Sequence, residues 1–424
     1  MGTNSQDADN LTAWLFDDNA IYRWGEPGMS IDRRGLFSAT AASLAAASAP
    51  AAASAARPAA RAASVLKPAP SDSPKAWARA NLRGCESLFM PSMAPNLVDL
   101  DEDGVRRDVD HVIRQGMVSL LPVGLGLDAT RARRFRQIVA EQARGRVFVV
   151  GALAPGAGET QAETLRTAEA LGCRHVMLPT SSLPTQEAIY QDMKSICEQT
   201  SLAVMLYASP QRSMRSLDPT GVPLDAFDRL ADLPNVVGVK VSQNLHAAAA
   251  VALAERVGDR LVLAVVDLEL MQALALKYPM QLTGQWGVDT IQSPEKPYAV
   301  EFMKLLGEGK LAEAQAAYWR VEPAATAFYQ LQGPYLARGG HPWLHMKYLQ
   351  WLTGGNGGLL ADLKQSPEVV PPLDAAGRRA CRNMLESVGI QVTARPEEAF
   401  VVGNAAYDRG TRALALASLP QYVA

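Results

Sequence analysis

The sequence has few cysteines, little net charge and no long apolar run, and each shortage excludes a class of protein. Its 424 residues include four scattered cysteines and no Cys-x-x-Cys pair, which argues against a disulfide framework or a cysteine-based zinc site. The formal net charge of −2 gives no sign of a surface for nucleic acid or anionic membrane. No run of about 20 strongly apolar residues occurs, which argues against a mature transmembrane helix. With 48% hydrophobic and 20% charged residues, the chain has the composition of a soluble globular protein.

The N-terminal region, residues 1–75, is expected to be disordered and to contain an export signal. Arg33 and Arg34 precede an uncharged stretch, 35–56, that is dominated by Ala and Ser, the pattern of a twin-arginine signal. Residues 1–28 carry five acidic side chains against one arginine, whereas a start at Met29 would give a suitable signal. We therefore expect a signal over 29–56, cleavage near 53–56 and a periplasmic or secreted protein. The alternative is a disordered linker in a cytoplasmic protein.

From about residue 80 the chain alternates between short β-rich apolar runs and amphipathic helical stretches. This alternation predicts a (β/α)8 TIM barrel over 80–295, although a doubly wound open sheet uses the same order. Helical segments over 296–391 predict a C-terminal helical appendage, and residues 392–424, which show no clear period, are expected to form a loosely attached tail. The eight predicted strands are 87–93, 119–125, 147–153, 175–180, 203–209, 236–242, 261–267 and 281–286.

One of these strands contains a lysine. In the run 236–242, alternation places Gly238, Lys240 and Ser242 on one face and three valines on the other. A lysine inside a strand is costly to bury unless it is paired or neutral. Desolvation favours the neutral amine, which lowers the pKa and makes the amine a nucleophile towards carbonyls. The alternative is a lysine at the end of the strand that reaches solvent.

The preceding strand, 203–209, contains one polar candidate and is followed by another. Tyr207 would place a phenol at the mouth of the barrel, where it could pass protons to and from a bound carbonyl. Arg212 carries a planar guanidinium suited to a carboxylate. Taken singly, a core tyrosine and a surface arginine explain these residues equally simply.

Taken together, the two strands resemble a known family. Tyr207-Ala208-Ser209-Pro210 and Gly238-Val239-Lys240 resemble two signatures of the dihydrodipicolinate synthase / N-acetylneuraminate lyase family, and the resemblance spans about residues 84–390. It implies a barrel fold and a class I aldolase mechanism. Lys240 would form a Schiff base with a 2-oxo acid such as pyruvate, and Tyr207 would move protons. No metal or organic cofactor is implied. Arg212 matches the position where synthases of the family carry an arginine near the second substrate's carboxylate.

The chain departs from the family at the loop after the second strand, which in the family usually reads Gly-Thr-Thr-Gly-Glu. Here residues 124–128 read Gly-Leu-Gly-Leu-Asp, so the two hydroxyls that hold the keto-acid carboxylate are absent. Thr180 and Ser181 replace the family's tyrosine pair. Trp286, at the end of the eighth strand, would narrow the mouth. For these reasons the lysine-biosynthesis reaction is not assigned.

Substrate carboxylates would then need other donors. We expect backbone amides at Gly124 and Gly126, the hydroxyls of Ser181 and Ser242, and the guanidinium of Arg212 to bind substrate. His341 and His345 have the i, i+4 spacing of a metal pair, but no acidic third ligand accompanies them, so no metal is expected.

Three functions remain open. The first is a Schiff-base lyase or synthase that acts on a 2-oxo acid and an aldehyde. The second is a hydratase or dehydratase of a sugar acid or aldol adduct that uses the same lysine. The third, of another class, is an inactive barrel that binds a small carboxylate. Because family members are commonly tetramers, a homo-oligomer, dimer or tetramer, is expected.

Overall fold

The computed structural model describes residues 73–152, 160–209, 212–242, 246–284, 287–415, 419 and 421–423. Its centre is one eight-stranded parallel sheet whose strands pair in chain order. A parallel bridge between Gly84 and Leu282 links the first strand region to the last, so the sheet closes into the predicted (β/α)8 barrel. The strands are β1 Glu86–Phe89, β2 Ser119–Pro122, β3 Phe148–Ala152, β4 His175–Pro179, β5 Ala203–Ala208, β6 Val236–Val241, β7 Val262–Val265 and β8 Leu282–Thr283.

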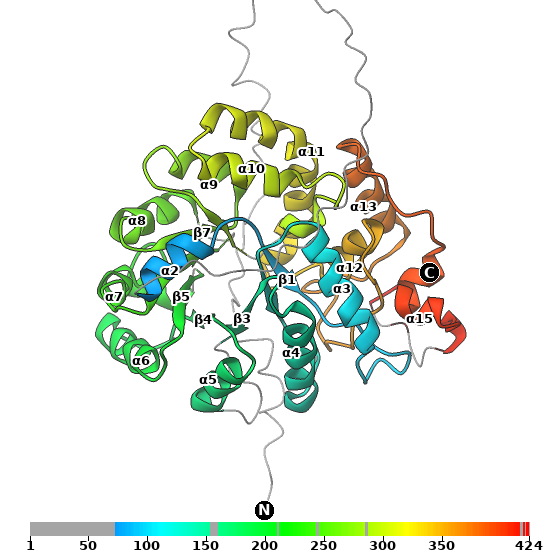
Figure 1. Ribbon diagram of the computed structural model, residues 1–424, viewed down its shortest axis with the longest axis horizontal. Coiled ribbons are helices and arrows are strands. Elements are labelled where there is room, and N and C mark those ends of the chain that lie inside the picture. Colours follow the sequence, from blue (N-terminus) through cyan, green and yellow to red (C-terminus); the bar gives the residue numbers. More distant parts are fainter. Residues whose placement is uncertain are drawn as a thin grey trace, which may run out of the picture.

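Helices surround the strands, as Figure 1 shows. Most begin at a residue whose side chain accepts a hydrogen bond from the first turn, as Asp101, Asp128 and Thr185 do, and Thr160 with Glu163 forms a full capping box. The outer helices are α3 Glu102–Arg114, α4 Ala129–Ala143, α5 Gln161–Ala170, α6 Gln186–Glu198, α7 Leu224–Leu230, α8 Ala247–Val257 and α9 Leu268–Leu274; a 3-10 helix, η2 Arg212–Ser216, precedes α7.

The first described helix was not predicted from the sequence. Helix α2, Pro74–Asn81, lies across the N-terminal end of the barrel in Figure 1 and buries Trp77 against the interior side chains Phe148 and Met205. Gln281, just before β8, donates from Nε2 to the carbonyl of Leu82 at 2.7 Å. Helix α2 therefore closes the end of the barrel that lies opposite the catalytic end of this fold.

Strand β6 contains an irregularity that alternation alone does not predict. Val204 pairs with Val236, but the next residue of β5, Met205, pairs with Gly238. Val237 is therefore an extra residue, and it packs in the cluster inside the barrel rather than with the outer valines. Lys240 keeps the inward direction that the sequence predicts.

The C-terminal region packs against one side of the barrel. It comprises η3 Val288–Thr290, α10 Tyr298–Gly307, α11 Leu311–Leu336, α12 Trp343–Leu352, α13 Ala375–Ser387, α14 Glu397–Val402, α15 Asn404–Asp408 and η4 Ala413–Ala415.

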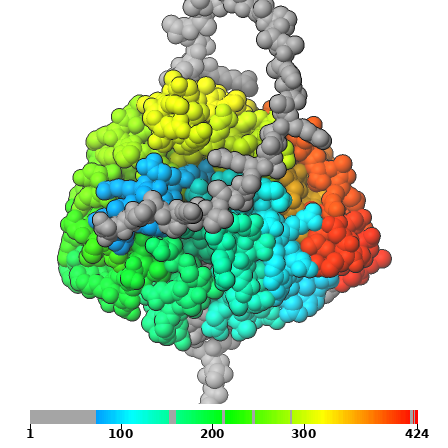
Figure 2. Space-filling model, in the orientation of Figure 1, coloured from blue at the N-terminus to red at the C-terminus, as the bar shows by residue number. Residues whose placement is uncertain are grey.

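The expectation of a loosely attached tail after residue 392 is wrong for the part that the structure describes. Phe400 is fully buried and its ring contacts Tyr348 and Trp351 of α12. Arg409 forms an ion pair with Asp101 at 2.9 Å, beside the start of α3. Figure 2 shows these last residues, in red, against the cyan of α3. Helices α14 and α15 are too short to show a helical period in the sequence.

The predicted export signal, residues 29–56, lies outside the described residues, as does the rest of the chain before Ser73. Within the described part, none of the helices combines the length and the apolar character needed to cross a membrane.

Candidate active site

Lys240 is the lysine that the sequence places inside the barrel, and the structure buries it there. It lies near the end of β6, with 6% of its surface exposed. Tyr207 of β5 is its register partner, and Lys240 Nζ lies 4.7 Å from the centre of the Tyr207 ring. Gly284, after β8, leaves room for the lysine, because a Cβ there would lie 3.3 Å from Lys240 Cγ.

Burial changes the acidity of this amine. Desolvation lowers the pKa of Lys240 to about 8, and the negative charge of Glu86 acts in the opposite direction. At pH 7 a lysine with a pKa of about 8 is neutral in about one molecule in ten, against about one in 3,000 at the ordinary pKa. A neutral amine attacks carbonyls, so the structure gives Lys240 the character of a nucleophile.

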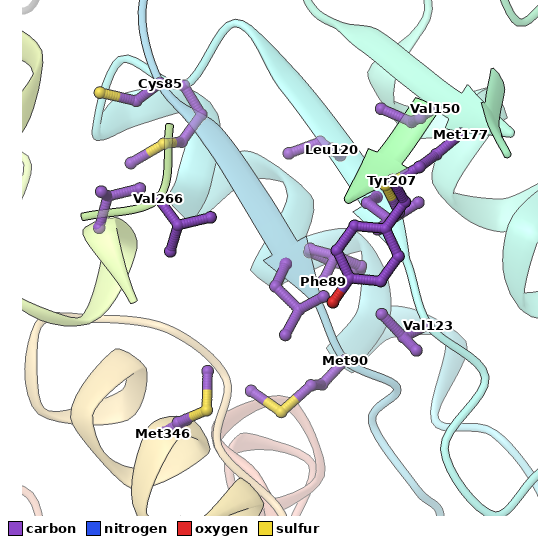
Figure 3. Close-up of a cluster of buried hydrophobic side chains, with 14 of the residues drawn as sticks. Cys85, Phe89, Met90, Leu120, Val123, Val150, Met177, Tyr207, Val266 and Met346 are labelled. Carbon is purple, nitrogen blue, oxygen red and sulfur yellow. The ribbon is translucent and has the colours of Figure 1, made fainter. Parts of the chain in front are cut away.

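Tyr207 and Ser242 lie beside this lysine. The hydroxyl oxygens of Tyr207 and Ser242 are 3.4 Å apart, and both residues are buried. The backbone carbonyl of Tyr207 accepts a hydrogen bond from Thr180 Oγ1 at 2.8 Å, which joins the ends of β4 and β5. Figure 3 shows the Tyr207 ring in the interior cluster that includes Phe89 and Met177. Lys240, Tyr207 and Ser242 therefore form one group at the catalytic end of the barrel.

Sequence reasoning missed a second polar group, which lies inside the barrel. Glu86, Ser119 and His175 are each the first residue of a strand, and all three are fully buried. Ser119 Oγ donates to Glu86 Oε2 at 2.5 Å, and His175 Nε2 lies 3.3 Å from the same oxygen. A polar residue at the same position of three strands was the signal in the sequence.

The two histidines considered as a metal pair point to different neighbours. His341 is buried against Trp343, with ring centres 4.6 Å apart, and its pKa lies well below the ordinary value through burial and then through the charge of Lys240. His345 lies against Gly377, and burial lowers its pKa to about 4, with Asp374 acting in the opposite direction. The described residues contain no group of three or more side chains placed to hold a metal ion. His341 thus belongs to the surroundings of Lys240.

The other predicted substrate-binding residues are not gathered in the same way. A Cβ on Gly126, where φ is +69°, would lie 2.9 Å from Ala361, and one on Gly124 would lie 3.1 Å from Ala132. Ser181 donates a hydrogen bond to Asp192 of α6. The carboxylate-binding roles of Gly124, Gly126 and Ser181 stay predictions.

Two residues with predicted roles at the mouth of the barrel are not fully covered by the structure. Arg212 begins η2, but its side chain is not among the described parts, and Trp286 lies outside the described residues altogether. Their roles in binding substrate and in narrowing the mouth stay predictions.

Asp267 lies two residues after β7 and caps helix α9. Its carboxylate accepts hydrogen bonds from the backbone N–H groups of Glu269 and Leu270 at the start of α9. We expect Asp267→Ala to lower the free energy of unfolding by about 1 kcal/mol, and Asp267→Asn, which can still cap, to lower it less. Urea denaturation measures both changes. A loss of Lys240 reactivity in a folded Asp267→Ala protein would contradict this purely structural role.

Comparisons with known proteins bear on the family and the fold. The family model described as the dihydrodipicolinate synthetase family matches residues 91–332, more than half of the chain. A 4-hydroxy-tetrahydrodipicolinate synthase of Halorhodospira halophila is 32% identical over 169 residues, which cover 38% of this chain and 54% of that protein. The chain thus spans about half the length of this relative. The corresponding protein of a Sulfurihydrogenibium species is 29% identical over 234 residues, 52% of this chain and 75% of that protein.

A solved structure extends the comparison to the fold. A protein described as the first monomeric dihydrodipicolinate synthase variant covers 73% of this chain and 97% of its own, with a TM-score of 0.57 and 20% sequence identity. At that identity the likeness shows that the two chains share the barrel fold.

Proposed function

Because the chain belongs to the dihydrodipicolinate synthetase family, whose members are lyases and synthases, we propose that it forms a Schiff base between Lys240 and a 2-oxo acid such as pyruvate. The observation that carries the proposal is the buried Lys240 amine, with a pKa lowered to about 8, beside the Tyr207 phenol inside a closed barrel. A covalent intermediate on a lysine needs no metal and no organic cofactor.

The proposed reaction begins with the neutral amine. The lone pair of Lys240 attacks the ketone carbon, and the ketone oxygen takes a proton to give a carbinolamine. Loss of that oxygen as water forms a cationic iminium, which withdraws electrons from the neighbouring C–H or C–C bond. When one of these bonds breaks, its electron pair enters an enamine. Hydrolysis of the iminium later returns the amine and the product ketone.

Tyr207 is the proposed proton carrier in these steps. The Lys240 amine lies 4.7 Å from the centre of its ring, and its hydroxyl oxygen lies 3.4 Å from that of Ser242, so we propose that protons pass between the reacting oxygen, the phenol and the serine. Ser242 takes part in this exchange from the end of β6.

The substrate beyond the 2-oxo acid is proposed only as a class. Leu125, which stands where the family carries a threonine, is buried with 1% exposure. The missing hydroxyl favours a substrate other than that of lysine biosynthesis. A hydratase or dehydratase of an aldol adduct, which would use the same iminium, stays the second candidate.

Borohydride trapping tests the proposed function. Intact full-length protein is incubated with a panel of 2-oxo acids, pyruvate foremost, and reduced. A stable mass increase that matches one reduced adduct supports the Schiff-base mechanism and identifies the donor. If well-folded protein forms no adduct with any member of the panel, the inactive carboxylate-binding barrel becomes the better reading.

Export and assembly are further proposals. Arg33 and Arg34 before the uncharged stretch 35–56 support twin-arginine export to the periplasm. We expect the Arg33→Lys/Arg34→Lys double variant to stay in the cytoplasm while the unchanged chain is processed, as cell fractionation and N-terminal sequencing would show. Equal processing of both would leave the cytoplasmic alternative. Assembly as a dimer or tetramer is proposed from the family, although one solved relative is a monomeric variant.

A further inference from the structure

An acidic side chain, Glu86, enters the interior of the barrel that also holds the reactive lysine. Glu86 is fully buried at the first position of β1. A buried carboxylate is costly unless donors or an opposite charge compensate it. Ser119 Oγ donates a hydrogen bond to Glu86 Oε2 at 2.5 Å, and His175 Nε2 lies 3.3 Å from the same oxygen. These two groups hold the carboxylate in one position inside the barrel.

The pairing of the strands places the carboxylate of Glu86 at nearly the same height along the barrel axis, here called its level, as Lys240. Lys240 pairs with Ala264 of β7, and the register continues through β8 to Gly84. In a barrel with a shear of about 8, the level moves by about one residue for each strand crossed. Three strands beyond Lys240, the same level therefore falls about three residues after Gly84, next to Glu86. Two long side chains thus enter the interior from well-separated strands at neighbouring levels.

The electrostatics agree with this placement. Burial lowers the pKa of Lys240, and the charge of Glu86 raises it. Among the described residues near the amine are the uncharged hydroxyls of Tyr207 and Ser242 and the imidazole of His341, whose pKa lies well below the ordinary value. A positive charge on Lys240 is therefore balanced from inside the protein by Glu86.

We propose that Glu86 is the internal counterion of Lys240, stabilising first the ammonium and then the iminium that forms on the same nitrogen. The inference rests on the proposed function for its second half. Glu86 acts on this nitrogen through its charge, so it is a positioning residue. Ser119 donates a hydrogen bond to the carboxylate, and His175 lies next to it. These polar neighbours weaken the electrostatic effect of the carboxylate on Lys240, so the amine is not held fully protonated. The amine of Lys240 therefore stays partly neutral and reactive, while the carboxylate of Glu86 stabilises the iminium.

The first test removes the charge of Glu86 and measures the protonation of Lys240 without any 2-oxo acid. Glu86→Gln keeps the shape of the side chain and removes the charge. In full-length protein, the rate of Lys240 acetylation by acetic anhydride is followed against pH by peptide mass spectrometry. We expect the midpoint of the pH profile to fall by about one unit, because an opposite charge has been lost. Glu255→Gln, which removes an exposed acid paired with Lys277, should leave the midpoint unchanged.

Ser119→Ala is the second variant, and it guards against a Glu86→Gln protein that fails to fold. Without this donor the carboxylate acts more strongly on the amine, so the midpoint should rise. Near-UV circular dichroism establishes that each variant is folded. An unchanged midpoint in folded Glu86→Gln, or in folded Ser119→Ala where the glutamine variant does not fold, would overturn the inference.

The iminium is tested separately. At a pH well above the midpoints of both proteins, where the free amine is neutral and only the iminium is charged, Glu86→Gln should yield roughly tenfold less borohydride-reduced pyruvate adduct at equilibrium than the unchanged protein. An equal yield would overturn the iminium half of the inference. A shifted acetylation midpoint with no adduct in either protein would support the pairing with the ammonium and overturn the proposed function instead.

Discussion

Replacing Lys240 with methionine is expected to abolish the borohydride-trapped adduct and to lower turnover by at least about 10³-fold, because the nucleophile is lost. Methionine fills most of the space of the lysine stem inside the barrel, so the fold should persist. Intact-mass measurement after reduction, with turnover of the trapped 2-oxo acid, provides the test. An adduct of unchanged yield in Lys240→Met would show that another amine reacts.

Two matched variants sharpen this result. Lys277→Met removes an exposed lysine that pairs with Glu255 and should change neither the adduct nor turnover. Tyr207→Phe keeps the ring over which Lys240 Nζ lies but removes the hydroxyl, and should lower turnover by about 10²-fold while the adduct still forms slowly. If Tyr207→Phe retained full turnover, the phenol would have no part in proton transfer.

Breaking the buried ion pair between α3 and α12 is expected to have the largest effect on the free energy of unfolding. Lys347 of α12 is 1% exposed, and its Nζ lies 3.4 Å from Asp108 Oδ2 of α3 and 3.2 Å from Ser92 Oγ. Asp108 Oδ1 also accepts a hydrogen bond from the backbone N–H of Asn356. The pair thus joins the barrel to the C-terminal helices.

Lys347→Met should lower the free energy of unfolding by about 3–5 kcal/mol, since Asp108 would be left buried without its cation. Lys277→Met, at an exposed pair, should change it by less than about 1 kcal/mol. Urea denaturation of both variants gives the comparison. A cost for Lys347→Met no greater than that for Lys277→Met would mean that the buried pair contributes nothing to the joint.

The same pair predicts a dependence of stability on pH. Burial lowers the pKa of Lys347, and this outweighs the opposing effect of Asp108. The folded pKa therefore lies below the unfolded one, so protons favour the unfolded chain. Stability contributed by this group should increase as the pH rises from the folded pKa towards the unfolded value, and that increase should be absent in Lys347→Met.

The barrel, and the presence of Tyr207 and Lys240 at its catalytic end, could be predicted because they depend on local patterns in the sequence. Eight apolar runs alternate with helical stretches, and Tyr207 and Lys240 lie on consecutive strands. Neighbouring strands in a parallel barrel lie side by side, so the closeness of Tyr207 and Lys240 follows from the order of the chain. Their direct register pairing also depends on the extra residue at Val237.

The features that sequence reasoning missed depend on contacts between distant residues. Glu86 and His175 are 89 positions apart, and only closure of the barrel brings them together. Helix α2 has eight residues, too few to show a period, and its place depends on Trp77 entering the interior. The extra residue at Val237 comes from the pairing of two strands, which alternation within one strand does not encode.

Peptide mapping of the reduced pyruvate adduct tests the central claim most directly. The full-length protein is incubated with pyruvate near pH 8, reduced with borohydride and digested, and every lysine-containing peptide is compared with an unreacted sample. We predict one modified residue, Lys240, because its buried amine combines a lowered pKa with a neighbouring phenol. Modification confined to exposed lysines such as Lys277, with Lys240 unmodified, would contradict the Schiff-base account.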